Sequence, residues 1–349
     1  MLEQEKRELL KRMGGMEQVA GVRPVSFSSG RAKGTEALEV RNLAGFQFTI
    51  LPDQCMNLLD LSWRGTNLGF LSKNGLTGER FASPLDSEFL YRWPAGMLYT
   101  CGLASTGPAN VDEGLYRTEH GRIGLMPAEN LSVVQGWEDD EYRIRVRGVM
   151  RESMLFGYNL RLTREISVGL FDRHLVIEDT LENLEPKEEP FMLLYHVNFG
   201  FPLVDDGTEV VRSNAQTKVH PATPSDALQA WNRMGPPVDG APEHVFYHTG
   251  DQSLPVHTAG VLNDTLGLGA YLRYPSENLP ILVHWKCPRS HDYVIGLEPS
   301  NSYILGRHEE RKNGSIRGIP GYGVLKYRLE LGVLDGAAEI NAFRLSVNG

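Results

Sequence analysis

The sequence places a histidine inside a segment that otherwise has the pattern of a buried β-strand. The segment "LLYHVNFGFP", residues 193–202, is apolar but carries His196 and Asn198 two residues apart. Because successive side chains of a strand point to opposite faces, these two polar side chains share one face, and the aromatic residues around them share the other. One face is therefore predicted to be core, and the other to meet a polar ligand.

Two further residues carry groups suited to proton transfer. Glu298 closes the strand-like segment "DYVIGLE", where Pro299 ends the pairing and leaves the carboxylate at the end of a strand. His120 lies in "TEHGRIG", where Gly121 permits an unusual backbone angle and Arg122 adds a permanent cation. Histidine and carboxylate side chains are the usual groups of general acid–base catalysis.

Two further segments carry aromatic and cationic side chains. Arg92 and Trp93 lie in "YRWPAG", and His284, Trp285 and Lys286 lie in "VHWKCP". The tryptophans suit a sugar, because the axial C–H faces of a pyranose stack on aromatic rings.

Each of these residues also has a purely structural interpretation. A single strand histidine is more often a hydrogen-bonded core residue than a catalyst. Glu298 fits an edge strand facing water, Arg122 fits a surface pair with Glu119, and Trp93 and Trp285 fit an ordinary core.

Motifs for other chemistries are missing from the sequence. It has no HExxH or HxH, no GxGxxG or GxxxxGK[ST] phosphate loop, and no GxSxG. His244 and His248 are spaced as i, i+4, but they lie in a proline-rich segment where a helix is doubtful. We therefore expect no metal and no activated serine.

Most of the chain shows the alternating pattern of β-strands. Period-two segments separated by turn residues include "FQFTILPD", "EYRIRVRGVM", "NLRLTREISV", "RHLVIEDTLENL" and "GVLKYRLELGVLD". In the third and fourth, "GLFDR" makes a hairpin connection, and Arg161, Thr163 and Glu165 form its solvent-facing side. The pattern predicts an all-β fold, a large antiparallel β-sandwich.

Two segments depart from the strand pattern. Leucine and methionine spacing near the N-terminus predicts an amphipathic helix within residues 1–20, which packs on the sheet or joins two subunits of a homodimer. Residues 219–258 are predicted to be a long irregular excursion. The remainder, residues 21–349, is expected to be one β-sandwich domain.

Composition restricts the function classes. The formal charge of −9, from 35 Lys and Arg against 44 Asp and Glu, is the wrong sign for a nucleic-acid binder. Three widely spaced cysteines suggest no disulfide framework, which favours the cytoplasm. The charged N-terminus has no apolar signal region, and no long apolar run is present, so no membrane partner is expected.

Three of these motifs, in this order, resemble a known family. The stretch from "NLRLTREISV" to "LLYHVNFGFPLV" resembles the central region of aldose 1-epimerases, the galactose mutarotase-like superfamily, and "VIGLEPSN" resembles the strand that bears its catalytic glutamate. "HGR", "PAE", "MLLYHVNFG" and "GLEPSN" resemble in particular a divergent bacterial branch of uncertain substrate. The similarity runs from about Gly45 to the C-terminus and implies a galactose mutarotase-like supersandwich.

The resemblance also implies roles for individual residues. His196 matches the family's general acid, Glu298 its general base, and His120 a second histidine that hydrogen-bonds the sugar. Glu243 in "PEHVFYH" stands nearest to a sugar-binding aspartate of the family.

The family's substrate-binding arginine has no clear counterpart. Arg92 and Arg122 are both candidates for its role. Asn198, Trp285 and Lys286 complete the predicted substrate-binding set.

We therefore expect an enzyme that interconverts the α and β anomers of a sugar. An ionised Glu298 would take the proton of the C1 hydroxyl and a protonated His196 would give one to the ring oxygen, without a cofactor. Two alternatives stay open: an isomerase or lyase for an acidic or phosphorylated sugar held by Lys286, Arg92 and Arg122, and a carbohydrate-binding protein without turnover.

Overall fold

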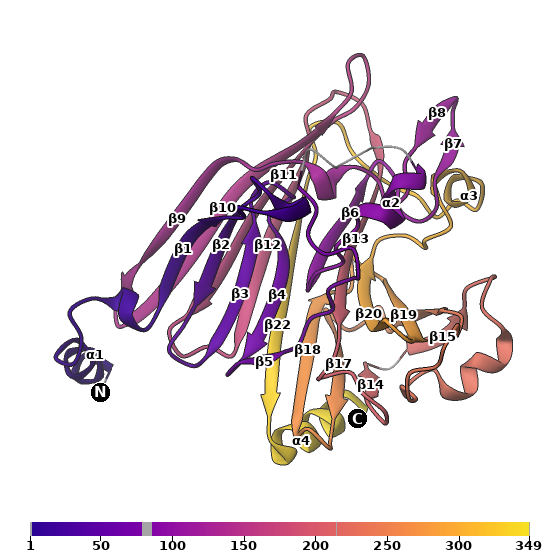
Figure 1. The fold of residues 1–349 in the computed structure, drawn as a ribbon. Coiled ribbons are helices and arrows are strands. Elements are labelled where there is room, and N and C mark those ends of the chain that lie inside the picture. The colour runs from indigo at the N-terminus through magenta and orange to yellow at the C-terminus, as the bar shows by residue number, and fades with distance from the viewer. Residues whose placement is uncertain (1, 79–85, 214, 349) are drawn as a thin grey trace.

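The protein consists mainly of two large antiparallel sheets that pack face to face (Figure 1). The computed structural model describes residues 2–78, 86–213 and 215–348. The prediction of an all-β antiparallel sandwich is confirmed.

The larger sheet contains twelve of the described strands and carries the residues of interest. Its order along the main path is β1 (Gly21–Ser26), β2 (Glu36–Arg41), β3 (Phe46–Leu51), β4 (Asn57–Trp63), β6 (Leu98–Leu103), β13 (Glu189–Phe199), β20 (Asp292–Ser300), β19 (Ile281–Arg289), β16 (His244–Gly250) and β15 (Ala215–Val219). The short strands β5 (Thr66–Asn67) and β21 (Arg317–Ile319) pair with β4 and β13.

The second sheet contains eight of the described strands. Their order is β14 (Glu209–Arg212), β17 (Val256–Asn263), β18 (Leu268–Pro275), β22 (Val324–Asp335), β12 (His174–Asn183), β11 (Asn159–Gly169), β10 (Glu141–Ser153) and β9 (Glu129–Glu138). The connection from β11 to β12 is the hairpin predicted at "GLFDR". A separate small hairpin pairs β7 (Asn110–Asp112) with β8 (Leu115–Arg117).

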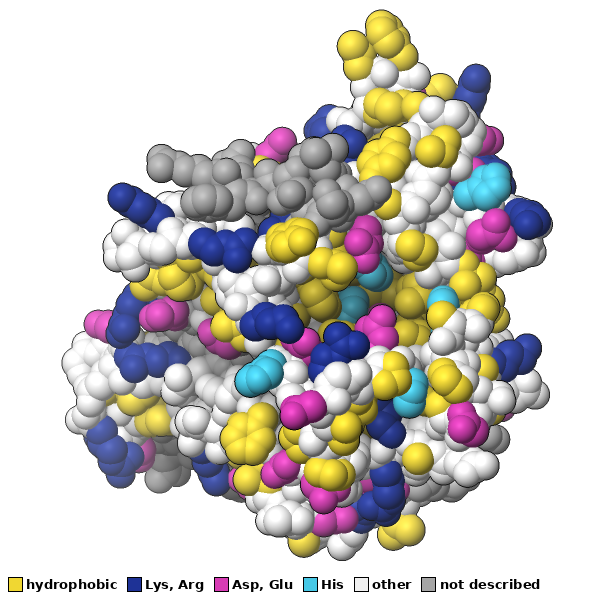
Figure 2. Space-filling view, turned by 45° about the vertical axis from the view of Figure 1, so that its right-hand side comes forward, with side chains coloured by type: hydrophobic (Ala, Val, Ile, Leu, Met, Phe, Trp, Pro, Cys, Tyr) yellow, Lys and Arg dark blue, Asp and Glu magenta, His cyan; other side chains and the backbone are white. Residues whose placement is uncertain are grey.

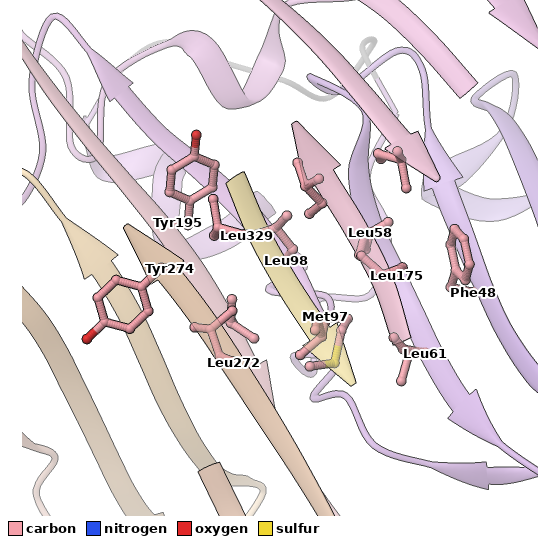
Figure 3. Close-up of a cluster of buried hydrophobic side chains, with 14 of the residues drawn as sticks. Phe48, Leu58, Leu61, Met97, Leu98, Leu175, Tyr195, Leu272, Tyr274 and Leu329 are labelled. Carbon is pink, nitrogen blue, oxygen red and sulfur yellow. The ribbon is translucent and has the colours of Figure 1, made fainter. Parts of the chain in front are cut away.

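The main core lies between the two sheets. Phe48, Leu58 and Leu98 from the larger sheet lie against Leu175 and Leu329 from the second (Figure 3). Burial of apolar surface contributes about 25 cal/mol per Å², so this interface dominates the stability of the fold.

On β13, the alternation predicted from the sequence is confirmed. Tyr195, Val197 and Phe199 all lie in the core between the sheets. His196 therefore points to the opposite face of the larger sheet, away from the second sheet.

Helices are few and peripheral. They are α1 (Leu2–Leu10), α2 (Asp86–Arg92), α3 (Arg307–Lys312) and α4 (Ala337–Asn348), with 3₁₀ turns at Met16–Gln18, Gly30–Ala32, Ile123–Leu125 and Ser225–Ala230. The N-terminal helix is present, and Lys6 lies over the ring of Trp137 on β9, 4.8 Å from its centroid. No helix in the described ranges is long and apolar enough to cross a membrane.

The irregular segment predicted over residues 219–258 is shorter in the structure. Within it, His244–Gly250 forms β16, which pairs with β19 on one side and β15 on the other. This strand buries Phe246, Tyr247 and His248 in succession, so both faces are covered and the alternating signal is absent. The irregular part lies between β15 and β16.

An ion pair inside the main core has no counterpart in the sequence prediction. Arg164 on β11 and Asp179 on β12 are both fully buried, and the arginine donates through Nε and Nη2 to the two carboxylate oxygens at 2.9 and 2.7 Å. Tyr195 also donates to Asp179, at 2.8 Å. This network links the second sheet to β13, the strand that carries His196.

Candidate active site

A cavity of about 770 Å³ opens on the face of the larger sheet that points away from the core. Figure 2 shows a hollow with histidine and hydrophobic side chains in its depth and charged side chains around it. The described residues that line the cavity come mainly from β13, β19, β20, α2 and the connecting segments, and they include His120, His196, Glu243, Trp285 and Glu298.

The register of β13 and β20 brings the predicted acid and base together. Val197 pairs with Leu297 in this antiparallel ladder, which places His196 directly opposite Glu298. Nε2 of His196 lies 3.3 Å from Oε1 of Glu298. The side chains are 7% and 2% exposed, so the two groups lie in the floor of the cavity and are almost shielded from bulk water.

Gly296 makes room for this pair. It lies two residues before Glu298 on the same face of β20 and opposite Trp285 on β19. A Cβ atom at Gly296 would contact Oε1 of Glu298 and Cβ of Trp285. The glycine therefore leaves the carboxylate free to reach His196.

Aromatic rings form the walls around the pair. The ring of Trp93 lies 4.9 Å from that of His196, and the ring of Trp285 lies 5.6 Å from it on another side. Phe89 stacks on Trp93 at 5.5 Å, and Phe70 meets Trp285 edge-on at 6.4 Å. Such walls suit a ligand with apolar C–H faces as well as polar groups.

His120 is brought to the cavity by a tight backbone turn. His120 and Gly121 have φ angles of +54° and +75°, the conformation that the glycine in "HGR" predicts. A Cβ at Gly121 would collide with the carbonyl oxygens of Gly102 and Ser105, so only glycine fits there. The ring of His120 lies 5.9 Å from that of His196.

Burial determines the protonation of these groups. It lowers the pKa of His196 well below the usual 6.5, and the neighbouring His120 lowers it further. It raises the pKa of Glu298 well above 4.5, with a smaller effect from Glu243. The pKa of His120 falls to about 4. Burial therefore favours a neutral histidine beside a carboxylic acid, the opposite of the protonated His196 and ionised Glu298 expected from the sequence.

Several buried polar atoms of the cavity lack a hydrogen-bond partner within the described protein. They are Nε1 of Trp93, Nδ1 of His120, Nδ1 of His196 and Oε1 of Glu298, whose 3.3 Å contact with His196 is not a hydrogen bond. Buried polar groups are normally hydrogen-bonded, so donors and acceptors that face a cavity are suited to binding a polar ligand.

Glu243 lies at the cavity, as its predicted role in sugar binding requires. It is exposed at the rim, and its carboxylate accepts a hydrogen bond of 2.7 Å from Nε1 of Trp285. The carboxylate therefore fixes the orientation of an aromatic wall and keeps further acceptor capacity for a ligand.

The structure places two predicted substrate-binding residues of the larger sheet away from the cavity. Asn198 shares the face of His196 but is fully buried, and its amide donates to the carbonyl oxygens of Gly96 and His196. Lys286 follows Trp285 and so points to the opposite face, where it donates to the carbonyl oxygens of Ala230 and Arg233. Both residues stabilise the strands that carry the site.

Neither of the two candidate arginines lines the cavity. Arg92 is buried behind Phe89, with its guanidinium 5.5 Å from the ring centroid. Arg122 is exposed and lines a second, smaller cavity behind the His120 turn. Neither arginine is therefore placed to contact a ligand in the large cavity.

Sequence reasoning missed several residues that line the cavity. Phe89 precedes Trp93 by four residues, and the i, i+4 spacing of two aromatic residues could have indicated it. Phe70 and Lys73 come from a connecting segment without a local signal, and Lys73 pairs at 2.7 Å with Asp292, the first residue of β20.

A comparison with protein-family models identifies the family of the chain. Residues 32–333 match the family described as a domain of unknown function, DUF4432. The chain belongs to this family. The name carries no activity, and a search of curated proteins found no match to this DUF4432 chain.

Solved structures with the same fold include three with named sugar chemistry. A candidate aldose 1-epimerase from Klebsiella pneumoniae has a TM-score of 0.88 and 24% identity, with 93% of this chain and 86% of that chain covered. A galactose mutarotase-like protein from Clostridium acetobutylicum has a TM-score of 0.60 and 14% identity, over 91% and 99%. Galactose 1-epimerase from Lactobacillus acidophilus has a TM-score of 0.54 and 14% identity, over 91% and 99%.

These similarities establish the fold. The DUF4432 chain has the galactose mutarotase-like fold, as the resemblance of its motifs implies. Because identity is below 25% in each case, its activity has to be argued from the site.

Proposed function

We propose that this DUF4432 protein is an enzyme of the aldose 1-epimerase type, which interconverts the α and β anomers of a neutral sugar. The observation that carries the proposal is the approach of His196 to Glu298, 3.3 Å apart, in the floor of a cavity with aromatic walls. General acid–base chemistry on a bound ligand needs such a donor and acceptor within reach of the same substrate.

The proposed reaction starts from a neutral His196 and a protonated Glu298, the states that burial favours. The neutral imidazole of His196 takes the proton of the C1 hydroxyl, and the carboxylic acid of Glu298 gives its proton to the ring oxygen. The C1–O5 bond breaks and C1 becomes an aldehyde carbon, while the pair becomes imidazolium and carboxylate.

Ring closure reverses both transfers. After rotation about the C1–C2 bond, His196 returns its proton to the carbonyl oxygen as O5 attacks C1, and Glu298 recovers the O5 proton. The pair ends in its starting state with the other anomer formed. The neutral His196 with protonated Glu298 that burial favours is thus the resting state. The protonated His196 with ionised Glu298 expected from the sequence is the state with the sugar ring open.

Charge at the cavity favours a neutral sugar over an acidic or phosphorylated one. The described lining contains four carboxyl groups, Glu119, Glu243, Asp292 and Glu298, and two cations, Lys73 and Arg289. Lys73 is paired with Asp292, and Nε of Arg289 donates to a backbone carbonyl. An anionic ligand would meet a net negative lining, so its desolvation would be poorly compensated.

The energetic cost of burying His196 and Glu298 in a ligand site favours catalysis over binding alone. Burying a carboxyl group and an imidazole in a ligand site opposes their charged forms, and pure recognition needs no matched proton donor and acceptor. A sugar-binding protein would be served as well by amide side chains.

Polarimetry tests the proposal. Purified protein is mixed with freshly dissolved α-anomers of neutral hexoses and pentoses, and the approach to optical equilibrium is followed. We expect His196→Ala to lower the protein-dependent rate by about 10²-fold or more. Full activity of that variant, or binding of a sugar without acceleration of its anomerisation by the wild type, would contradict the proposal.

A further inference from the structure

A second cavity, of about 220 Å³, lies behind the turn that carries His120. It is lined by residues of β8, of the end of β10 and of the segments around 104–105 and 118–122, including Ser105, Arg117, Arg122 and Tyr158. One water needs only about 15 Å³ by a comparable measure, so the cavity has room for a small polyatomic ligand.

Arg117 is the most unusual residue of this cavity. It is 7% exposed, and its Nε has no hydrogen-bond partner within the described protein. Among the ion pairs of the described residues none involves Arg117, although it interacts electrostatically with Glu189, and its guanidinium lies 6.0 Å from the ring of Tyr158. A nearly buried guanidinium without an ion pair is costly unless a ligand completes it.

Two further groups that line the cavity, Ser105 and Arg122, are also suited to binding an anion. Ser105 is fully buried and its hydroxyl also lacks a partner within the described ranges. Arg122 lines the cavity from the exposed side and supplies a second guanidinium. Two arginine forks and a hydroxyl are the donors that hold phosphate and carboxylate groups.

Two carboxyl groups near Arg117, those of Glu152 and Glu189, interact with other groups. Glu152 is buried and accepts hydrogen bonds from the amides of Leu103 and Ala104 and from the hydroxyl of Tyr158. Burial raises its pKa, and these hydrogen bonds oppose that rise. Glu189 interacts electrostatically with Arg117 but lies 3.6 Å from Arg307. Neither satisfies the hydrogen-bond donors of Arg117.

We propose that the cavity formed by Ser105, Arg117 and Arg122 binds a small oxyanion, a phosphate or a carboxylate group. The site is separate from the sugar cavity but shares its backbone: Thr118, Gly121 and Arg122 line the oxyanion site, while Glu119 and His120 line the sugar cavity. A bound oxyanion would therefore hold the turn that positions His120. The proposal does not depend on the proposed epimerase activity.

Isothermal titration of the full chain with inorganic phosphate tests the site, at constant ionic strength with chloride as the replaced ion. We expect one site per chain with a dissociation constant in the millimolar range or tighter. Parallel titrations with sulfate, acetate and a hexose 6-phosphate distinguish a free inorganic ion, a carboxylate and a phosphate carried on a metabolite.

Variants assign the binding to this cavity. Arg122→Gln changes an exposed side chain, so it is expected to fold normally and to weaken binding about tenfold or more. Arg117→Lys keeps the charge but loses the fork, and we expect a similar loss. Arg328→Gln removes an exposed arginine of β22, 57% exposed, and should bind like the wild type. Absence of saturable binding to every anion, or wild-type binding by both cavity variants, would overturn the proposal.

Discussion

Replacing Glu298 by glutamine is expected to remove activity without reducing stability. Glutamine keeps the size of the side chain and removes an ionisable group that is 1% exposed. Because that group gives its proton to the ring oxygen on ring opening and takes it back on ring closure, we expect a loss of about 10²- to 10⁴-fold in anomerisation rate. This corresponds to about 2.7 to 5.5 kcal/mol of transition-state stabilisation.

The effect on stability follows from the raised pKa of Glu298. The folded protein binds this proton more tightly than the unfolded chain, where the pKa is about 4.3. Wild-type stability should therefore fall as the pH rises from that value towards the folded pKa, by at most about 1.4 kcal/mol per pH unit for one proton. The glutamine variant lacks this contribution, so it should equal or exceed the wild type at pH 8.

Urea unfolding at pH 5 and pH 8, with polarimetry on the same samples, measures both effects. Glu152→Gln is the matched control, because Glu152 is also buried but accepts three protein hydrogen bonds. An amide cannot accept all three, and that variant should lose about 1 to 3 kcal/mol of unfolding free energy. A comparable loss for Glu298→Gln at pH 8 would show that Glu298 is a structural residue and refute the reasoning.

Two further predictions concern the pH profile and the core. Since burial and His120 lower the pKa of His196, the acidic limb of kcat/KM should have its midpoint below pH 6.5; a midpoint at or above 6.5 would contradict the neutral histidine. Asp179→Asn leaves Arg164 buried without its counter-ion and should cost about 3 to 5 kcal/mol of unfolding free energy in urea. Glu182→Gln, which breaks the partly exposed pair with Arg161 on the same strands, should cost about 0 to 1 kcal/mol. Equal losses of unfolding free energy in the two variants would contradict the statement that burial makes the Arg164–Asp179 pair the more important one.

Local patterns in the sequence determined the strands and the faces of their side chains. The alternation around His196 predicts that its neighbours lie in the core and that the histidine does not, and the structure has this arrangement. The turn at Gly121 was equally predictable, because the required backbone angle is a property of one residue. Such features depend on the period of a strand or on a single φ angle.

The tertiary structure decided which side chains meet. The pairing of β13 with β20 places His196 opposite Glu298, and a shift of one residue would move either side chain to the other face. Likewise, only the tertiary structure shows that Lys286 meets the carbonyl oxygens of Ala230 and Arg233, and that Arg164 meets Asp179 in the core. Register between strands about 100 residues apart depends on the burial of many side chains at once, which no local stretch of sequence encodes.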